Sequence, residues 1–175
     1  SALNSFTNEL NANGGTFESD ISNFYPFSSN LAYQTYLVNP LLNDSTQYNH
    51  VFSNSSNIKQ HTTYETRGGS GEVFFAMGGN YNDKLYIGAS LGIPTVRYVY
   101  DKHYTETSDD SDTLTLANSY SVHDYVKTSG AGVNFKLGLI YKVVDWFRIG
   151  TAFHTPTVYS LHDEYETIVN SEMKD

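Results

Sequence analysis

The 175-residue sequence contains no cysteine, which excludes disulfide-based scaffolds and cysteine-ligated metal sites. Its 10 lysines and arginines stand against 19 aspartates and glutamates, for a net charge of −9. An acidic chain repels phosphates and anionic headgroups, so nucleic acid and anionic membrane surfaces are unsuitable partners. Apolar residues make up 39% of the chain, which is low for a compact soluble domain.

The sequence also lacks a run of about 18 apolar residues, and we therefore predict no transmembrane helix. This absence leaves membrane strands open, because a barrel strand needs only about 10 alternating residues. No signal peptide is recognisable. The first and last segments, SALNSF and SEMKD, do not resemble natural termini. We expect an internal fragment of a longer chain.

Aromatic residues are abundant, at 15% of the chain, and 15 of them are tyrosines. Tyrosine combines an apolar ring with a polar tip, so it suits surfaces that meet lipid headgroups or ligands. Asparagine and serine are also frequent, which is typical of long exposed loops.

The most informative segment, residues 130–161, consists of two alternating runs joined by a very short turn. Its odd-numbered positions are mainly apolar: Ala131, Val133, Phe135, Leu137, Leu139 and Tyr141, then Phe147, Ile149, Thr151 and Phe153. Its even-numbered positions are small or polar, apart from Ile140: Gly132, Asn134, Lys136, Gly138 and Lys142, then Arg148, Gly150, Ala152 and His154. Successive side chains of a strand point to opposite faces, so each run predicts a strand with one apolar face. With Trp146 at the turn, this pattern is typical of a transmembrane β-hairpin.

The length of the apolar run supports this interpretation. Ten steps of roughly 3.3 Å, tilted by about 45°, span on the order of 23 Å. That is close to the roughly 25 Å apolar band of an outer-membrane barrel. A strand of a soluble sandwich usually has about 5–6 residues.

Two further long strands are predicted upstream, at 72–81 and 84–104, and a third at 113–141. We expect Gly68–Gly71 to form a turn or bulge, Pro94 to mark a bulge or kink, and the third strand to be interrupted near Ser129. Because the outward residues are odd-numbered on both strands of each hairpin, both loops must contain an odd number of residues. Loops at 82–84 and 144–146 satisfy that condition.

Residues 1–58 are polar and are predicted to be a loop region with two short helices. Leu3, Phe6 and Leu10 share one helical face, and Gly14 and Gly15 would end that helix. A second helix is expected from Leu31, broken near Asn39 by Pro40, with loop over 43–57. Residues 59–175 would then be antiparallel barrel-wall strands, so that the chain is a single incomplete domain.

Several of these segments resemble a known family. The segments NYNDKLYIGASLGIP, LAYQTYLVNP and TSGAGVNFKLGLIYKVVDWFRIGTAFHTPTVYSL are similar to outer-membrane transporters of the long-chain fatty-acid (FadL/TodX) type. The likeness is to the Bacteroidetes branch, some members of which carry the label hemin receptor. The pattern rests on Gly132, Asn134, Lys136, Gly138, Tyr141, Trp146, Arg148, Gly150, Thr155 and Pro156.

The resemblance implies a fourteen-stranded barrel, plugged by a hatch, that passes hydrophobic small molecules passively across the bacterial outer membrane. Partners would be the lipid bilayer and the remaining strands and hatch of the parent chain. The two N-terminal helices would be an external insert. The family's high-affinity pocket cannot be assigned to this sequence, because the hatch and the closing strands are missing.

Two groups of residues are candidates for ligand binding. Apolar residues of the N-terminal helices would form a landing groove or, equally, cap the sheet: Leu3, Phe6, Leu10, Leu31, Leu37 and Val38. Lys136, Arg148 and His154 lie on the lumen-facing side, where they could meet a carboxylate. We favour the simpler interpretation that they form a polar ladder paired with Glu72 or with neighbouring strands.

Six histidines raise the possibility of a haem or metal site: His50, His61, His103, His123, His154 and His162. None stands at a metal-ligand spacing in the sequence, so surface or lumen roles are favoured and no cofactor is predicted. Asp109, Asp110 and Asp112 are expected to form a solvated loop rather than a cation site. Because no catalytic grouping or phosphate loop stands out, an enzyme is not expected.

The alternative to an outer-membrane barrel is a soluble, tyrosine-rich β-sandwich that binds carbohydrate or protein. A sandwich would pack its apolar faces together in a closed core. Exposure of Phe135, Leu137, Ile149 and Phe153 would count against it.

Overall fold

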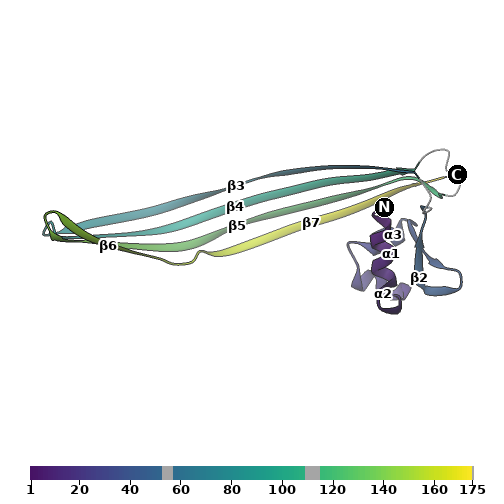
Figure 1. The fold of residues 1–175 in the computed structure, drawn as a ribbon, viewed down its shortest axis with the longest axis horizontal. Coiled ribbons are helices and arrows are strands. Elements are labelled where there is room, and N and C mark those ends of the chain that lie inside the picture. Colours follow the sequence, from purple (N-terminus) through teal and green to yellow (C-terminus); the bar gives the residue numbers. More distant parts are fainter. Residues whose placement is uncertain (53–56, 109–114, 175) are drawn as a thin grey trace. The chain divides into compact units, whose positions relative to one another are not determined.

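The computed structural model describes residues 1–52, 57–108 and 115–174. It is mostly β, with long antiparallel strands and short N-terminal helices, as predicted (Figure 1). The helical elements are α1 (Leu3–Asn11), the 3₁₀ turn η1 (Ala12–Gly14), α2 (Glu18–Phe24) and α3 (Ser29–Gln34). The strands are β1 (Val38–Leu41), β2 (Asp44–His50), β3 (Ile58–Tyr81), β4 (Leu85–Ser108), β5 (Ala117–Val144), β6 (Phe147–His154) and β7 (Val158–Met173).

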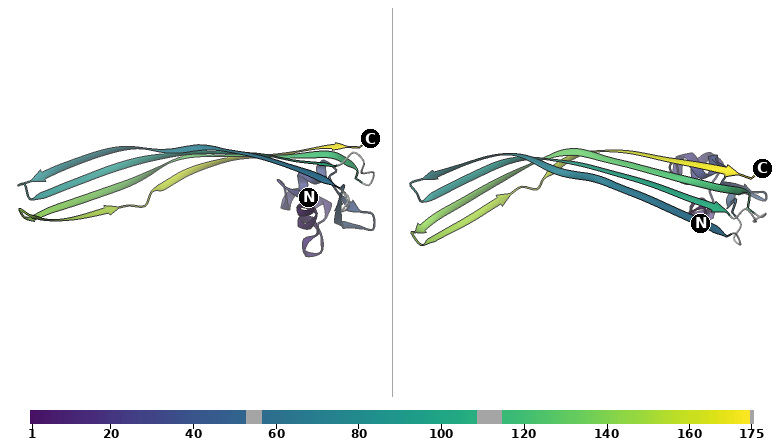
Figure 2. Two further views of the ribbon diagram at one scale, coloured as in Figure 1. Left: turned by 45° about the horizontal axis from the view of Figure 1, so that its top comes forward. Right: turned by 90° about the horizontal axis from the view of Figure 1, so that it is seen from above.

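The long strands form one five-stranded sheet in the order β3-β4-β5-β6, and β7 also pairs with β5. Figure 2 shows these strands side by side in two further views. After β6 the chain leaves the ladder at residues 155–157 and re-enters as β7. At this break Thr155 replaces a backbone partner: its Oγ1 accepts a hydrogen bond from the amide of Phe135 at 2.9 Å.

The observed register confirms that odd-numbered residues share one face of the second hairpin. Leu137 pairs with Phe153 and Tyr141 with Ile149, whereas Lys136 pairs with His154. The predicted three-residue loop at 144–146 is wrong in detail. β5 and β6 are separated by two residues, and a register shift between Lys142 and Val144 supplies the extra residue. A bulge therefore preserves the parity that the side-chain pattern requires.

The first hairpin has the predicted loop, because residues 82–84 separate β3 from β4. Asn82 and Asp83 have φ values of 51° and 53°, and the amide of Lys84 donates to the carbonyl of Tyr81 at 3.1 Å. Left-handed conformations at two successive positions match the twist of the flanking strands.

None of the three positions predicted to weaken or interrupt a strand ends one. β3 runs without interruption through Gly68–Gly71, β4 continues through Pro94, and β5 continues through Ser129. Pairing with long neighbouring strands outweighs the low strand propensity of glycine and proline at these positions. Strand β7 extends to Met173. The predicted acidic loop at 109–112 lies outside the described residues.

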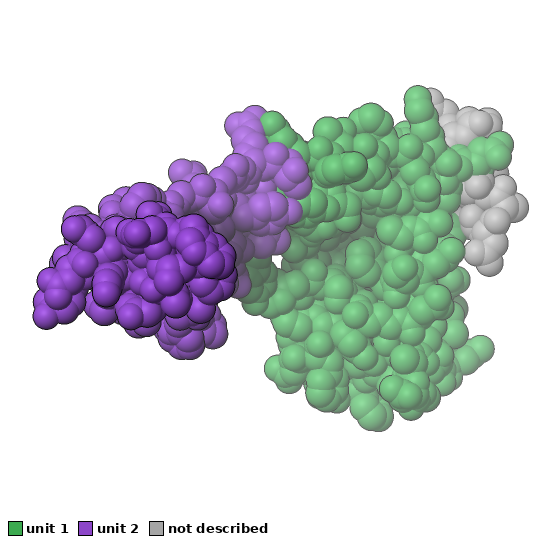
Figure 3. All heavy atoms as spheres, turned by 60° about the vertical axis from the view of Figure 1, so that its left-hand side comes forward, with its two compact units in different colours: residues 1–65, 100–125, 165–175 green, residues 66–99, 126–164 purple. Residues whose placement is uncertain are grey.

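The described chain divides into two compact units, coloured separately in Figure 3. Unit 1 comprises residues 1–65, 100–125 and 165–175, and unit 2 comprises residues 66–99 and 126–164. All buried members of the hydrophobic core belong to unit 1: Leu3, Leu10, Ile21, Ala32, Leu37, Val38, Tyr48, Val51, Phe52, Ala117, Tyr120 and Val122.

The N-terminal region contains more secondary structure than predicted. Helix α1 ends at Asn11, and the 3₁₀ turn η1 that follows it ends as expected at Gly14 and Gly15, which have φ values of 96° and 105°. The predicted second helix is misplaced: α3 ends at Gln34, since Tyr36 adopts a left-handed φ of 58°. The segment around Pro40 is instead strand β1, paired with β2, which replaces the predicted loop.

Helix α1 and the β1–β2 hairpin are joined by reciprocal hydrogen bonds. The Asn11 side chain donates to the carbonyl of Tyr48 at 2.9 Å and accepts from its amide at 2.7 Å. Tyr48 in turn donates its hydroxyl to the carbonyl of Thr16 at 3.0 Å. These bonds satisfy the polar groups of a strand whose sequence, DSTQYNH, carries no alternation.

Candidate functional site

A cavity of about 400 Å³ lies inside unit 1, between one face of the sheet and the N-terminal segment. Its floor comes from three adjacent strands: Lys102 and Tyr104 of β4, Val122 and Asp124 of β5, and Thr167 and Val169 of β7. Its roof comes from the N-terminal segment: Ala2, Ser5, Phe6, Phe27 and Ser28. A concave, largely apolar space of this size with few polar groups is typical of a small-molecule site.

The polar side of the cavity is a short network on the sheet. Lys102 Nζ lies 3.4 Å from Asp124 Oδ2. Thr167 donates its hydroxyl to the other carboxylate oxygen of Asp124 at 3.1 Å. Lys102 thus places one cationic group in the cavity lining, in reach of a polar ligand group.

A buried carboxylate fixes the start of the roof. Glu106 is fully buried and accepts hydrogen bonds from Ser1 Oγ at 2.5 Å, from the amide of Ala2 at 2.8 Å and from Gln60 Nε2 at 2.9 Å. Tyr104 donates its hydroxyl to the same carboxylate. Burial and this hydrogen bond to Glu106 both raise the pKa of Tyr104, so that the phenol stays a donor.

The rest of the roof is tied down by serine and aromatic contacts. Ser28 donates to Glu9 at 2.7 Å, and Ser29 donates to the carbonyl of Phe6 at 3.1 Å. The ring of Phe27 meets Tyr165 of β7 edge to face, with centroids 4.8 Å apart. The cavity wall is therefore held from both the helical and the sheet side.

Unit 2 carries a separate polar cluster on its even-numbered face. Asn134 is 8% exposed and donates to Glu72 Oε1 at 2.9 Å, while Lys136 Nζ lies 3.3 Å from the same oxygen. Gly92 leaves room for this carboxylate, because a Cβ there would lie 2.1 Å from Glu72 Oε1. Of the predicted polar ladder, the pairing of Lys136 with Glu72 is confirmed.

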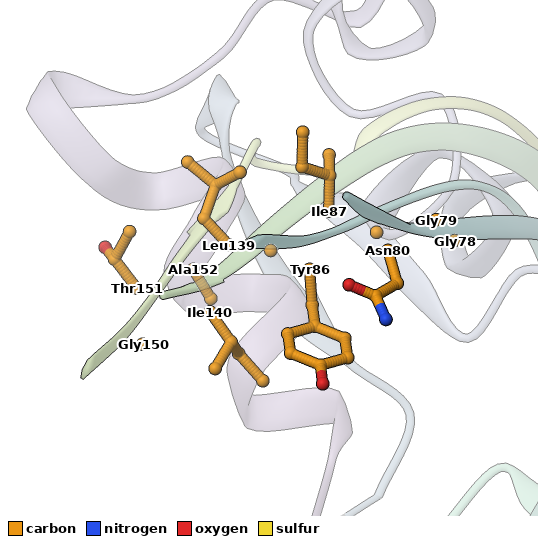
Figure 4. Close-up of a pocket in the computed structure, with 12 residues that line it drawn as sticks. Gly78, Gly79, Asn80, Tyr86, Ile87, Leu139, Ile140, Gly150, Thr151 and Ala152 are labelled. Atoms are coloured by element: carbon orange, nitrogen blue, oxygen red, sulfur yellow. The ribbon is translucent and has the colours of Figure 1, made fainter. Parts of the chain in front are cut away.

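A shallow trough lies beside this cluster on the sheet. Small residues of four strands line much of it: Gly78, Gly79, Gly88, Gly138, Gly150, Thr151 and Ala152. In Figure 4 the side chains of Asn80, Tyr86 and Ile140 point to one side of the sheet and those of Ile87, Leu139 and Thr151 to the other.

The predicted groove residues separate in the structure. Leu37 and Val38 are fully buried in the core, as are Leu3 and Leu10, and Leu31 is half-buried. Of the predicted apolar set, Phe6 lines the cavity.

The predicted lumen residues share one face, but the structure does not gather them into a single site. Lys136 and His154 are cross-strand neighbours, whereas Arg148 pairs with Lys142 nearer the turn. Arg148 and His154 are exposed.

The sequence predicts the strands but not which of them pair. It therefore missed side chains that meet only across two neighbouring strands. Lys102 and Asp124 are 22 residues apart and meet only because β4 and β5 are adjacent. The same pairing brings together Asp101, His103 and His123, within the part of the chain that the structure describes. The spacing of histidines along the sequence does not reveal this proximity, because His123 comes from a different strand than Asp101 and His103.

No family model and no characterised protein matches this chain. Among the described residues, no helix is long and apolar enough to cross a membrane.

Proposed function

We propose that this chain is part of the wall and the external cap of an outer-membrane β-barrel that takes up hydrophobic small molecules, such as long-chain fatty acids, without catalysis. The long strands of unit 2 would be the membrane part. The helices and the cavity of unit 1 would be the receiving part, outside the bilayer.

The exposed apolar face of unit 2 is the observation that carries this proposal. Its odd-numbered side chains leave large areas uncovered: 67% for Phe75, 80% for Met77, 55% for Ile149 and 62% for Phe153. A soluble protein seldom exposes an apolar patch of this extent. Lipid tails would cover it without a second protein layer.

The opposite face supports the same assignment. It combines small residues with the Glu72, Asn134 and Lys136 cluster, as expected for a wall that faces a polar lumen. At the turn of the second hairpin, the indole of Trp146 is 86% exposed beside Phe147. Aromatic side chains at this position would mark the membrane interface.

The open edges of the sheet favour a larger barrel. Strand β3 pairs only with β4 in the described chain, and β6 only with β5. Long, unprotected edges of this kind promote aggregation unless further strands pair with them. The β-sandwich alternative requires a closed apolar core. The exposure of Phe135, Ile149 and Phe153 within unit 2 speaks against it, whereas Leu137 is half-buried.

Cell fractionation tests the location. When the gene that encodes this chain is expressed in a Gram-negative host, we expect the protein in the outer-membrane fraction, extractable only with detergent. Recovery in the soluble fraction without detergent would overturn the proposal.

Ligand binding tests the cavity. We expect the detergent-solubilised protein to bind palmitate, with the alkyl chain against Phe6 and Val169 and the carboxylate at Lys102. Lys102→Met should weaken palmitate binding roughly tenfold while leaving binding of the uncharged alcohol of the same length unchanged. Asp124→Asn should strengthen palmitate binding, since it removes a negative charge beside Lys102.

The matched control is Lys127→Met. Lys127 pairs with Glu164 in unit 2, at 2.8 Å, and does not line the cavity. Equal loss of palmitate binding in the Lys102 and Lys127 variants would reject the cavity as the receiving site, whatever the location of the protein.

A further inference from the structure

We infer that Asp101, His103 and His123 form a binding site for a late first-row divalent cation, with zinc as the best-fitting ion. The site is independent of the proposed transport function. It lies in unit 1, where β4 and β5 pair.

The strand geometry brings the three side chains to one face. Asp101 and His103 are two residues apart on β4, so they project from the same side of the sheet. His123 comes from the adjacent β5. The ligand atoms of all three lie within 4.8 Å of one another.

The distances suit a small tetrahedral ion. His123 Nε2 and His103 Nε2 lie 3.0 Å and 3.2 Å from the same oxygen, Oδ1 of Asp101. Two ligands bound about 2.0 Å from a tetrahedral ion are separated by about 3.3 Å. An ion therefore needs only a small outward movement of side chains that already converge.

The two imidazoles are arranged in parallel. Their ring centroids are 4.0 Å apart and their planes differ by 10°. In this stacked arrangement both Nε2 atoms lie close to Oδ1 of Asp101. The side chain of His103 is 62% exposed and that of His123 is 29% exposed, so an ion can enter from solvent.

The donor set selects the kind of metal. Two imidazole nitrogens and one carboxylate oxygen suit zinc, copper, nickel or cobalt, whereas calcium and magnesium prefer oxygen donors throughout. Three protein ligands leave a fourth position for water or an external ligand. The neighbouring cation Lys102 pairs with Asp124.

Calorimetric titration of the full chain with ZnCl₂ tests the site. We expect one high-affinity Zn²⁺ per chain, and no comparable binding of Mg²⁺. His103→Ala and His123→Ala should each weaken Zn²⁺ binding by roughly tenfold or more. Asp101→Asn keeps the shape of the side chain but removes its charge, so we also expect weaker binding.

The control is His162→Ala, because His162 lies in unit 2 beside Glu164 and is exposed. This variant should bind Zn²⁺ as the wild type does. Unchanged Zn²⁺ binding in the His103/His123 double alanine variant would overturn the inference.

A second readout does not depend on the folding of variants. In ¹⁵N spectra of the wild-type histidines, Zn²⁺ should shift the Nε2 resonances of His103 and His123 and leave those of His154 and His162 in place. A shift confined to other histidines would also reject the site.

Discussion

At the scale of single residues, the most demanding group is the buried carboxylate of Glu106. Burial raises the pKa of Glu106, but hydrogen bonds from Ser1, Tyr104, Ala2 and Gln60 together lower it by more. The pKa of Glu106 therefore lies below the ordinary value of 4.5. The ionised carboxylate is thus the form that the folded state of unit 1 favours.

Substitution of Glu106 should therefore destabilise unit 1. Glu106→Ala leaves several buried donors without an acceptor, and we expect a loss of about 3–5 kcal/mol in the free energy of unfolding. Glu106→Gln retains an oxygen acceptor and should cost less. Denaturant titration followed by circular dichroism compares the two variants, and equal stability of the alanine variant and the wild type would contradict this role.

The same group predicts a pH dependence. A folded pKa below the unfolded one means that Glu106 stabilises the fold above about pH 4.5, and that this contribution disappears as the pH falls through the folded pKa. The stability difference between the wild type and Glu106→Gln should therefore narrow as the pH is lowered from 6 to below 4.5. A difference that stays constant with pH would argue against an ionised Glu106.

At the scale of the elements, β5 is the central strand, because it pairs with β4, β6 and β7. Its glycines are not equivalent. A Cβ on Gly130 would lie 2.3 Å from the carbonyl oxygen of Ser160 in β7, whereas a Cβ on Gly138 would meet nothing closer than 4.0 Å. The close approach of two backbones, rather than a break in the strand, explains the glycine at position 130.

This contrast gives a matched pair of substitutions. Gly130→Ala should force β5 and β7 apart and cost about 1–3 kcal/mol, as overpacking does in other proteins. Gly138→Ala should change stability by less than about 0.5 kcal/mol. Thermal unfolding of both variants measures the difference, and similar melting temperatures would show that the two strands can separate freely at Ser160.

At the scale of the whole molecule, the question is which solvent covers each face of unit 2. Phe153 and Ala152 are neighbours on β6, both exposed, and point to opposite faces of the sheet. Their substitution by arginine separates a lipid-facing from a lumen-facing position.

We expect Phe153→Arg to weaken folding into lipid vesicles by about 2–4 kcal/mol if the residue lies near the bilayer centre, and by less near an interface. Ala152→Arg should fold almost as the wild type does. Folding yield in vesicles as a function of urea concentration measures both. The reverse order, with Ala152→Arg the more damaging, would place lipid on the other face.

The sequence by itself determined the long strands and their two faces. An alternation such as that of Phe135, Leu137 and Leu139 is a local property, and the parity it imposed on the loops was preserved in the structure even where a bulge replaced a longer loop. The sequence also placed the end of the first helical segment correctly, because two adjacent glycines can adopt left-handed conformations without cost.

Only the tertiary structure decided which polar groups meet. Strand β2 and the short helix α2 carry no periodic pattern, and β2 is held by bonds to residues such as Asn11, far away in the sequence. The cavity beside Lys102 and the cluster of Asp101, His103 and His123 likewise depend on the pairing of β4 with β5 and on the helical segment folding back over the sheet. A strand pattern fixes the face on which a side chain lies, but the identity of its neighbour depends on which strand pairs beside it and in which register.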